Sequence, residues 1–82
     1  MNRNWVLYML MCSDASLYTG ITADLEKRLR LHDEGKASKY TRSKRPLTLV
    51  YNEGLENESS ARRREVEVKE LSRQKKLELI KS

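Results

Sequence analysis

The hydrophobic pattern of the first part of the chain predicts a β-hairpin. Every position of Trp5–Cys12 is apolar or aromatic, which is typical of a central strand whose two faces are both covered. Turn-forming residues follow, and Leu17–Ile21 is predicted to return as the second strand. Because side chains alternate along a strand, Tyr8 and Tyr18 share a face if the loop holds an odd number of residues or a bulge, and lie on opposite faces otherwise.

A helix is predicted to follow the hairpin directly. It covers Ala23–Asp33, with Thr22 as its cap, Asp24 in its positive first turn and Gly35 as its stop. The next segment, Lys36–Arg45, carries five cations and is predicted to be an exposed loop. Such a segment is a solvated surface about as often as it is a surface that binds a sugar-phosphate backbone, so both interpretations stay open.

The second half of the chain predicts one more strand and two helices. The strand is Leu47–Tyr51, a helix begins at Asn57 or at a serine close behind it and extends to about Leu71, and a short last helix begins at Ser72. Together the elements predict an α+β fold: a three-stranded, largely antiparallel sheet flanked by helices, in the order β-β-α-β-α-α. With 82 residues, the chain is expected to form a single domain over 1–82.

Charge and cysteine content narrow the class of protein. Seventeen basic against twelve acidic residues give a formal charge of +5, which on a small domain favours nucleic acid as the partner over a merely soluble basic protein. Cys12 has no second cysteine to pair with and lies in an apolar run, so we expect a buried thiol in a reducing compartment. The sequence shows neither a membrane-length apolar stretch nor a signal-peptide pattern, and a cytoplasmic location is expected.

One carboxylate interrupts the apolar stripe of the helix after Asn57. Ala61 and Val68 recur at helical spacing, and Glu65 falls between them. A buried carboxylate needs a cation or hydrogen-bond donors, because leaving it unpaired costs several kcal/mol. Two interpretations stay open: an ion pair with Arg62 or another arginine at the edge of the core, or a metal ligand.

A second group of polar residues surrounds the end of the hairpin. Tyr18 and Gly20 are expected where the second strand ends, and Arg28 and His32 are four apart, which places them on one face of the following helix. A phenol, an arginine and an imidazole in one neighbourhood could hold a phosphate, although His32 could equally be an ordinary helix-surface histidine. The sequence offers no zinc-ligand pattern, glycine-rich phosphate loop or nucleophile elbow as a competing site.

These residues resemble the motifs of the GIY-YIG nuclease family, in particular its small stand-alone bacterial members of uncharacterised function. The family's two tripeptides correspond to Val6-Leu7-Tyr8 and Tyr18-Thr19-Gly20. The resemblance covers nearly the whole chain, since Arg28, His32 and Glu65 follow at matching places. The residues after Glu65 contain no asparagine, whereas many members have one late in the domain.

The resemblance implies a metal-dependent endonuclease that hydrolyses DNA phosphodiester bonds with one divalent ion, Mg²⁺ or Mn²⁺. By that resemblance Glu65 would be the protein ligand of the metal, and Arg28 would hold the scissile phosphate. Tyr8 would help to deprotonate the attacking water, Tyr18 would orient water or phosphate, and His32 would relay the proton.

Candidate substrate-binding residues are Gly20, Lys39, Tyr40 and Arg42. The expected partner is DNA, and RNA stays open as an alternative. We expect no membrane partner, and a second protein that targets the domain to its substrate also stays open. Two other functions stay open: a non-catalytic nucleic-acid-binding module on the same scaffold, and a small protein-interaction domain. The nuclease interpretation requires Arg28 and Glu65 to meet the two tyrosines in one cleft.

Overall fold

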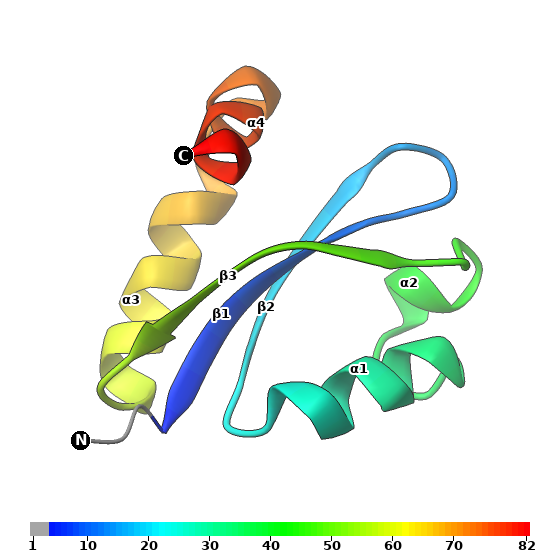
Figure 1. Ribbon diagram of the computed structural model, residues 1–82, viewed down its shortest axis with the longest axis horizontal. Helices are drawn as coiled ribbons and strands as arrows, with labels where there is room; N and C mark the ends of the chain where they lie inside the picture. The colour runs from blue at the N-terminus through cyan, green and yellow to red at the C-terminus, as the bar shows by residue number, and fades with distance from the viewer. Residues whose placement is uncertain (1–3) are drawn as a thin grey trace.

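A three-stranded antiparallel sheet forms the centre of the computed structural model, which describes residues 4–82. Its strands are β1 (Trp5–Met11), β2 (Leu17–Thr22) and β3 (Thr48–Leu55). Their order is β2-β1-β3, so the apolar strand β1 is central, as predicted (Figure 1). Strand β2 is left at one edge of the sheet.

Two pairs of helices flank this sheet: α1 (Leu25–Asp33) with α2 (Lys39–Arg42), and α3 (Glu58–Lys69) with α4 (Arg73–Lys81). In Figure 1 the strands pass between the two pairs. The predicted α+β fold and element order are confirmed, with α2 as one added helical turn in the basic segment that was predicted to be a loop. Within the described part of the chain, no helix is long and apolar enough to cross a membrane.

The alternation of side chains along β1 explains why this strand is apolar throughout. Leu7 and Met9 are fully buried and pack with Val68 of α3, together with partly buried residues of α4. Tyr8 points to the other face, where its hydroxyl group meets His32 of α1. Both faces of β1 are therefore covered, each by one pair of helices.

The hairpin has the odd loop that the functional interpretation requires. Met11 pairs with Leu17, so the loop holds the five residues 12–16. Tyr8 is then opposite Gly20, and Tyr18 is two positions further along the same face. Both tyrosines therefore point to the side of the sheet that α1 covers.

The start of α1 differs by one detail from the prediction. Asp24, not Thr22, is the N-cap: its Oδ1 accepts a hydrogen bond from the amide of Lys27 at 3.1 Å. Thr22 stays in β2 opposite Val6, and its hydroxyl accepts from the amide of Asp24 at 3.0 Å. Sheet pairing therefore decides between two residues that are both good caps.

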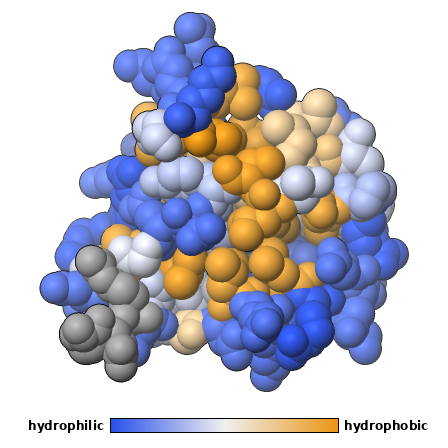
Figure 2. Space-filling model, in the orientation of Figure 1, coloured by the Kyte–Doolittle hydropathy of each residue, from blue (hydrophilic) through white to orange (hydrophobic). Residues whose placement is uncertain are grey.

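One face of the molecule carries a continuous apolar surface. Figure 2 shows it as a band across the middle of the view, with hydrophilic residues on both flanks. The exposed large apolar side chains include Leu49 on β3 and Val66 on α3.

Candidate active site

The ring of Tyr8 crosses directly over Gly20 on the neighbouring strand. A Cβ atom at Gly20 would lie 2.6 Å from the Tyr8 hydroxyl oxygen and 2.8 Å from Cζ, closer than side chains approach. The glycine is therefore required by space and not by a positive φ angle. Because Gly20 has no side chain, the ring of Tyr8 on the central strand β1 can extend across β2 towards the edge of the sheet.

A buried chain of hydrogen bonds begins at the hydroxyl group of Tyr8. It lies 2.8 Å from Nε2 of His32, whose Nδ1 lies 2.9 Å from the hydroxyl oxygen of Thr41. Thr41 in turn donates to the carbonyl oxygen of Ser38 at 3.4 Å. The tautomer that fits this chain has the proton on Nδ1 of His32, leaving Nε2 to accept from Tyr8.

The alternative interpretation of His32 as a surface histidine is wrong. Its side chain is 1% exposed and is enclosed by Tyr8, Tyr18 and Thr41. Burial lowers the pKa of His32, and the positive charge of Arg28 lowers it further. His32 is therefore neutral at pH 7 and able to accept a proton.

Tyr18 is the centre of an aromatic cluster that joins the hairpin to both helices on its side. Its ring centroid lies 5.3 Å from that of His32 and 5.9 Å from that of Tyr40, both with edge-to-face geometry. Tyr40 also donates a hydrogen bond to the hydroxyl oxygen of Ser16 in the hairpin loop at 3.0 Å. The predicted substrate-binding residue Tyr40 thus helps to fix α2 against the hairpin.

An open pocket of about 310 Å³ lies at the β2 edge of the sheet. We call it the tyrosine pocket; its lining residues are Trp5, Tyr8, Tyr18, Gly20, Ile21, Arg28, Glu58, Arg62 and Glu65. Arg28 comes from α1 and Glu65 from α3, so the two helix pairs meet there around the edge strand. Five of the predicted site residues share this pocket, whereas His32 lies behind it, bonded to Tyr8.

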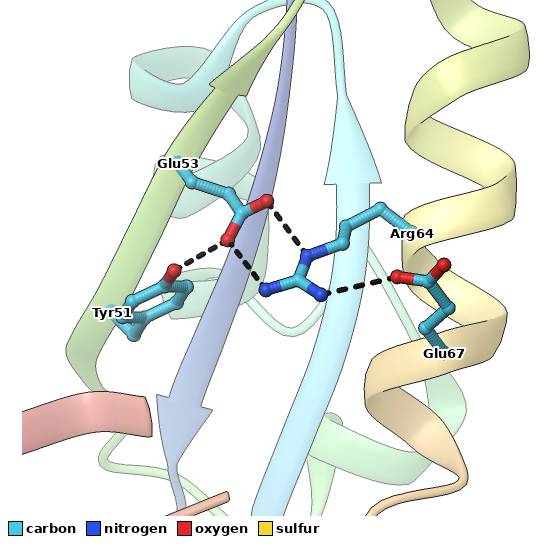
Figure 3. Close-up of polar contacts among 4 residues, drawn as sticks. All are labelled: Tyr51, Glu53, Arg64 and Glu67. Atoms are coloured by element: carbon cyan, nitrogen blue, oxygen red, sulfur yellow. Dashed lines mark hydrogen bonds and ion pairs between the residues drawn. The ribbon is translucent and has the colours of Figure 1, made fainter. Parts of the chain in front are cut away.

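An ion-pair network fixes α3 so that Glu65 reaches the tyrosine pocket. Figure 3 shows Arg64 extending from α3 to Glu53 on β3, with Nε 2.8 Å from one carboxylate oxygen. Glu67 pairs with the same guanidinium at 3.1 Å, and Tyr51 donates to Glu53. Successive helical residues are about 100° apart, so holding Arg64 against β3 turns Glu65 towards β2.

The partner of Glu65 differs from the simplest expectation. Its carboxylate pairs with Lys69 at 3.1 Å, while Arg62 pairs with Glu58. The Glu65 side chain is 22% exposed, so its headgroup keeps contact with solvent. An exposed lysine that can move away leaves this carboxylate available to a second cation.

The electrostatics of Tyr8 reflect its position between opposite charges. Burial raises the pKa of Tyr8 far above its ordinary value, and Tyr18 and Glu65 raise it further. Arg28 acts in the opposite direction and lowers the pKa. The hydroxyl group is therefore protonated at pH 7, and its ionised form needs additional positive charge nearby.

The two predicted cationic contacts of the substrate lie outside the tyrosine pocket. Lys39 and Arg42 line a separate hollow of about 360 Å³, which we call the basic pocket, together with Gly35, Lys36 and Ser38. Gly35 has φ +77°, as expected of a residue that ends a helix. This pocket presents three cations on one surface next to α2.

Sequence analysis missed three residues of this region and considered Arg62 only as an ion-pair partner of Glu65. Glu58 and Arg62 precede Glu65 by seven and three positions, and this helical spacing could have placed all three on one face. Trp5 was assigned only to the core strand. No sequence motif around Thr41 indicates its role, because that role depends on its hydrogen bond with the distant His32.

The donor set at the pocket suits a metal that retains most of its water. In residues 4–82, no three His, Cys, Asp or Glu side chains are grouped as a ready-made metal site. Glu58 and Glu65 both line the pocket, and Glu65 is close enough to Tyr8 for its charge to raise the pKa of the Tyr8 hydroxyl. One carboxylate with water and substrate oxygens fits Mg²⁺, which seldom uses an all-protein cage, and does not fit zinc.

Comparison with known proteins supports the same family. The GIY-YIG catalytic domain matches residues 4–78. The chain is 48% identical over 80 residues to a UPF0213 protein of Staphylococcus saprophyticus, covering 98% of this chain and 96% of that one. It is 49% identical over 74 residues to a UPF0213 protein of Staphylococcus haemolyticus, covering 90% of each.

A solved structure has the same fold. The solution NMR structure of the UPF0213 protein BH0048 from Bacillus halodurans matches with a TM-score of 0.62 and 43% identity, over 94% of this chain and 82% of that one. Nucleases of this class generally use divalent metals and act on nucleic acids. The protein is a member of the GIY-YIG nuclease family.

Proposed function

We propose that this protein is a metal-dependent endonuclease that hydrolyses phosphodiester bonds of DNA at the tyrosine pocket. The observation that carries the proposal is the meeting of Arg28 and Glu65 with Tyr8 and Tyr18 in one pocket. These residues come from α1, α3 and two strands, so no single helix face would bring them together. A site for a phosphate and a cation explains why opposite charges gather there.

The two charged residues have complementary tasks in this proposal. Glu65 holds the divalent ion, which when bound would polarise the phosphate and acidify water. Arg28 binds the non-bridging oxygens of the scissile phosphate with its planar, permanently charged fork, and balances the charge that develops there. Tyr18 borders the same space and orients the phosphate or the attacking water.

The buried hydrogen-bond chain provides a route for the proton of the water. Tyr8 accepts this proton as its own hydroxyl proton passes to Nε2 of His32, 2.8 Å away. Thr41 accepts from Nδ1 of His32 and thereby keeps Nε2 free for this transfer. The route avoids a long-lived phenolate, which the raised pKa of Tyr8 disfavours.

The basic pocket gives the substrate a second region of contact. Lys36, Lys39 and Arg42 would neutralise phosphates of a strand whose scissile bond lies in the tyrosine pocket. Tyr40 and Tyr18 connect the two regions. These contacts read charge and not base sequence, so they fit the phosphates of DNA or RNA, and DNA is the substrate class that we propose.

Two other functions make different predictions. A non-catalytic module on this scaffold would bind nucleic acid but would not need the pairing of Glu65 with a metal. A protein-interaction domain would use the apolar band of Figure 2 instead of the charged pocket. The nuclease is preferred because the residues with catalytic chemistry gather at the tyrosine pocket.

Replacing Glu65 by Gln should reduce Mg²⁺- or Mn²⁺-dependent cleavage at least about 100-fold, and Arg28→Ala should reduce it about 100- to 1000-fold. The measurement is single-turnover cleavage of labelled duplex, single-stranded and branched DNA. Matched controls are Glu70→Gln at the C-cap of α3 and Arg30→Ala on α1, both exposed positions, which should retain activity. Metal-dependent cleavage that survives Glu65→Gln would contradict the proposal, and binding without cleavage would favour the non-catalytic module.

The single histidine should titrate below its ordinary pKa of 6.5, because burial and Arg28 oppose its charged form. The unfolded chain then binds more protons than the folded one, so the free energy of unfolding falls as pH drops below about 7, by at most about 1.4 kcal/mol per pH unit. NMR titration gives the midpoint, and His32→Gln should lessen the pH dependence of stability. A midpoint above 6.5 would contradict the buried, neutral histidine.

Binding to duplex DNA should weaken with salt, and Lys39→Ala should lower the slope of log affinity against log salt by about 1. Fluorescence anisotropy at several salt concentrations measures this slope. Lys75→Ala on α4, which lies on the other side of the sheet, is the matched control and should leave the slope unchanged. Equal effects of both variants would remove the basic pocket from the proposed contact surface.

A further inference from the structure

A third hollow of about 330 Å³ adjoins the tyrosine pocket and plays no part in the mechanism above. We call it the Trp5 pocket; the lining residues that matter here are Trp5, Thr22, Asp24, Lys27, Arg28 and Leu31. Trp5 and Arg28 line both pockets, so the two hollows are neighbours on either side of the same pair of residues. A ligand anchored by Arg28 therefore reaches the Trp5 pocket without crossing the sheet.

The chemistry of the Trp5 pocket suits a flat, partly apolar ligand that carries negative charge. Trp5 and Leu31 supply aromatic and aliphatic surface, while Lys27 and Arg28 supply two cations. Asp24 also lines the pocket; its Oδ1 accepts the N-cap hydrogen bond from Lys27, and its second carboxylate oxygen is a further acceptor. A nucleotide combines these features, because its base has a π-face and polar edges and its phosphates are anionic.

The basic pocket provides a useful contrast. Its lining residues within 4–82 include the cations Lys36, Lys39 and Arg42 but no aromatic side chain. Its surface can therefore neutralise phosphates but offers no ring on which a base could stack. Among the three hollows described, the Trp5 pocket joins an aromatic side chain and cations without the tyrosines of the proposed reaction.

We propose that the Trp5 pocket binds the unpaired base of the nucleotide next to the phosphate held by Arg28, with the indole of Trp5 as the stacking surface. This inference rests on the proposed function and adds a substrate class to it. A base inside a duplex is stacked on both faces and cannot stack on Trp5. The preferred substrate then carries a single-stranded nucleotide at the cleavage site, as in an overhang, flap or gap.

The sequence makes the test direct, because Trp5 is the only tryptophan of the chain. Tryptophan emission of the full-length protein is recorded during titration with a single-stranded oligodeoxynucleotide, in the presence of a chelator that prevents cleavage. The matched ligand is the same strand with abasic sites, which keeps every phosphate but removes the bases. Quenching by the normal strand and much weaker quenching by the abasic strand are expected.

Two substitutions separate stacking from a loss of structure. Trp5→Leu should bind the normal strand about tenfold more weakly and should lose the preference over the abasic strand. Trp5→Phe keeps a ring and should retain most of that preference, measured by anisotropy of a labelled strand. Circular dichroism establishes that each variant is folded. Equal binding of both strands by the wild-type protein would overturn the inference.

Cleavage measured on the same samples distinguishes this inference from the proposed function. Glu65→Gln should keep the base-dependent quenching, since Glu65 does not line the Trp5 pocket. Base-dependent quenching in a protein that cuts no DNA would support the Trp5 pocket while the endonuclease proposal fails. If the protein cuts DNA but a bound strand leaves Trp5 emission unchanged, the inference about the Trp5 pocket fails and the endonuclease proposal stands. Equal cleavage rates on fully paired and single-stranded sites would have the same meaning.

Discussion

The close approach of Tyr8 to Gly20 is the constraint on which the rest of the site depends. Any side chain at Gly20 would occupy the space of the Tyr8 hydroxyl, 2.6 Å from where its Cβ would be. Because Gly20 leaves this space to the Tyr8 ring, a tyrosine of the central strand reaches His32 and also borders the pocket at the sheet edge. One missing side chain thus connects the core, α1 and the candidate active site.

Charges on the two sides of α3 are held differently, and this difference suits the proposed chemistry. Arg64 is fixed by Glu53 and Glu67, so it orients α3 and is not free for a phosphate. Among residues 4–82 the ion-pair partner of Glu65 is the more exposed Lys69, and in the proposed mechanism Glu65 exchanges that partner for a metal ion. Rigid pairing on one side of α3 therefore positions an exchangeable carboxylate on the other.

Most of the fold followed from the sequence because it depends on local patterns: apolar continuity placed β1, and turn residues placed the hairpin. The site residues were selected by the spacing of motifs that resemble the family's, and the structure places Tyr8, Gly20, Arg28 and Glu65 in one pocket. The helical turn α2 was not predicted, because its buried Thr41 is stabilised by a contact with His32 that no local pattern encodes. The ion-pair partner of each acidic residue could not be predicted from the sequence either, because several basic residues are close to each acidic one along the chain.

The central claim is that Glu65 and Arg28 form one site for a metal and a phosphate at the β2 edge. The most direct test is NMR of the isotope-labelled protein titrated with low concentrations of paramagnetic Mn²⁺. Amide signals of Gly20, Arg28 and Glu65 should broaden most steeply and those of α4 least, and Glu65→Gln should abolish the effect. Broadening centred elsewhere, or unchanged by Glu65→Gln, would contradict the claim.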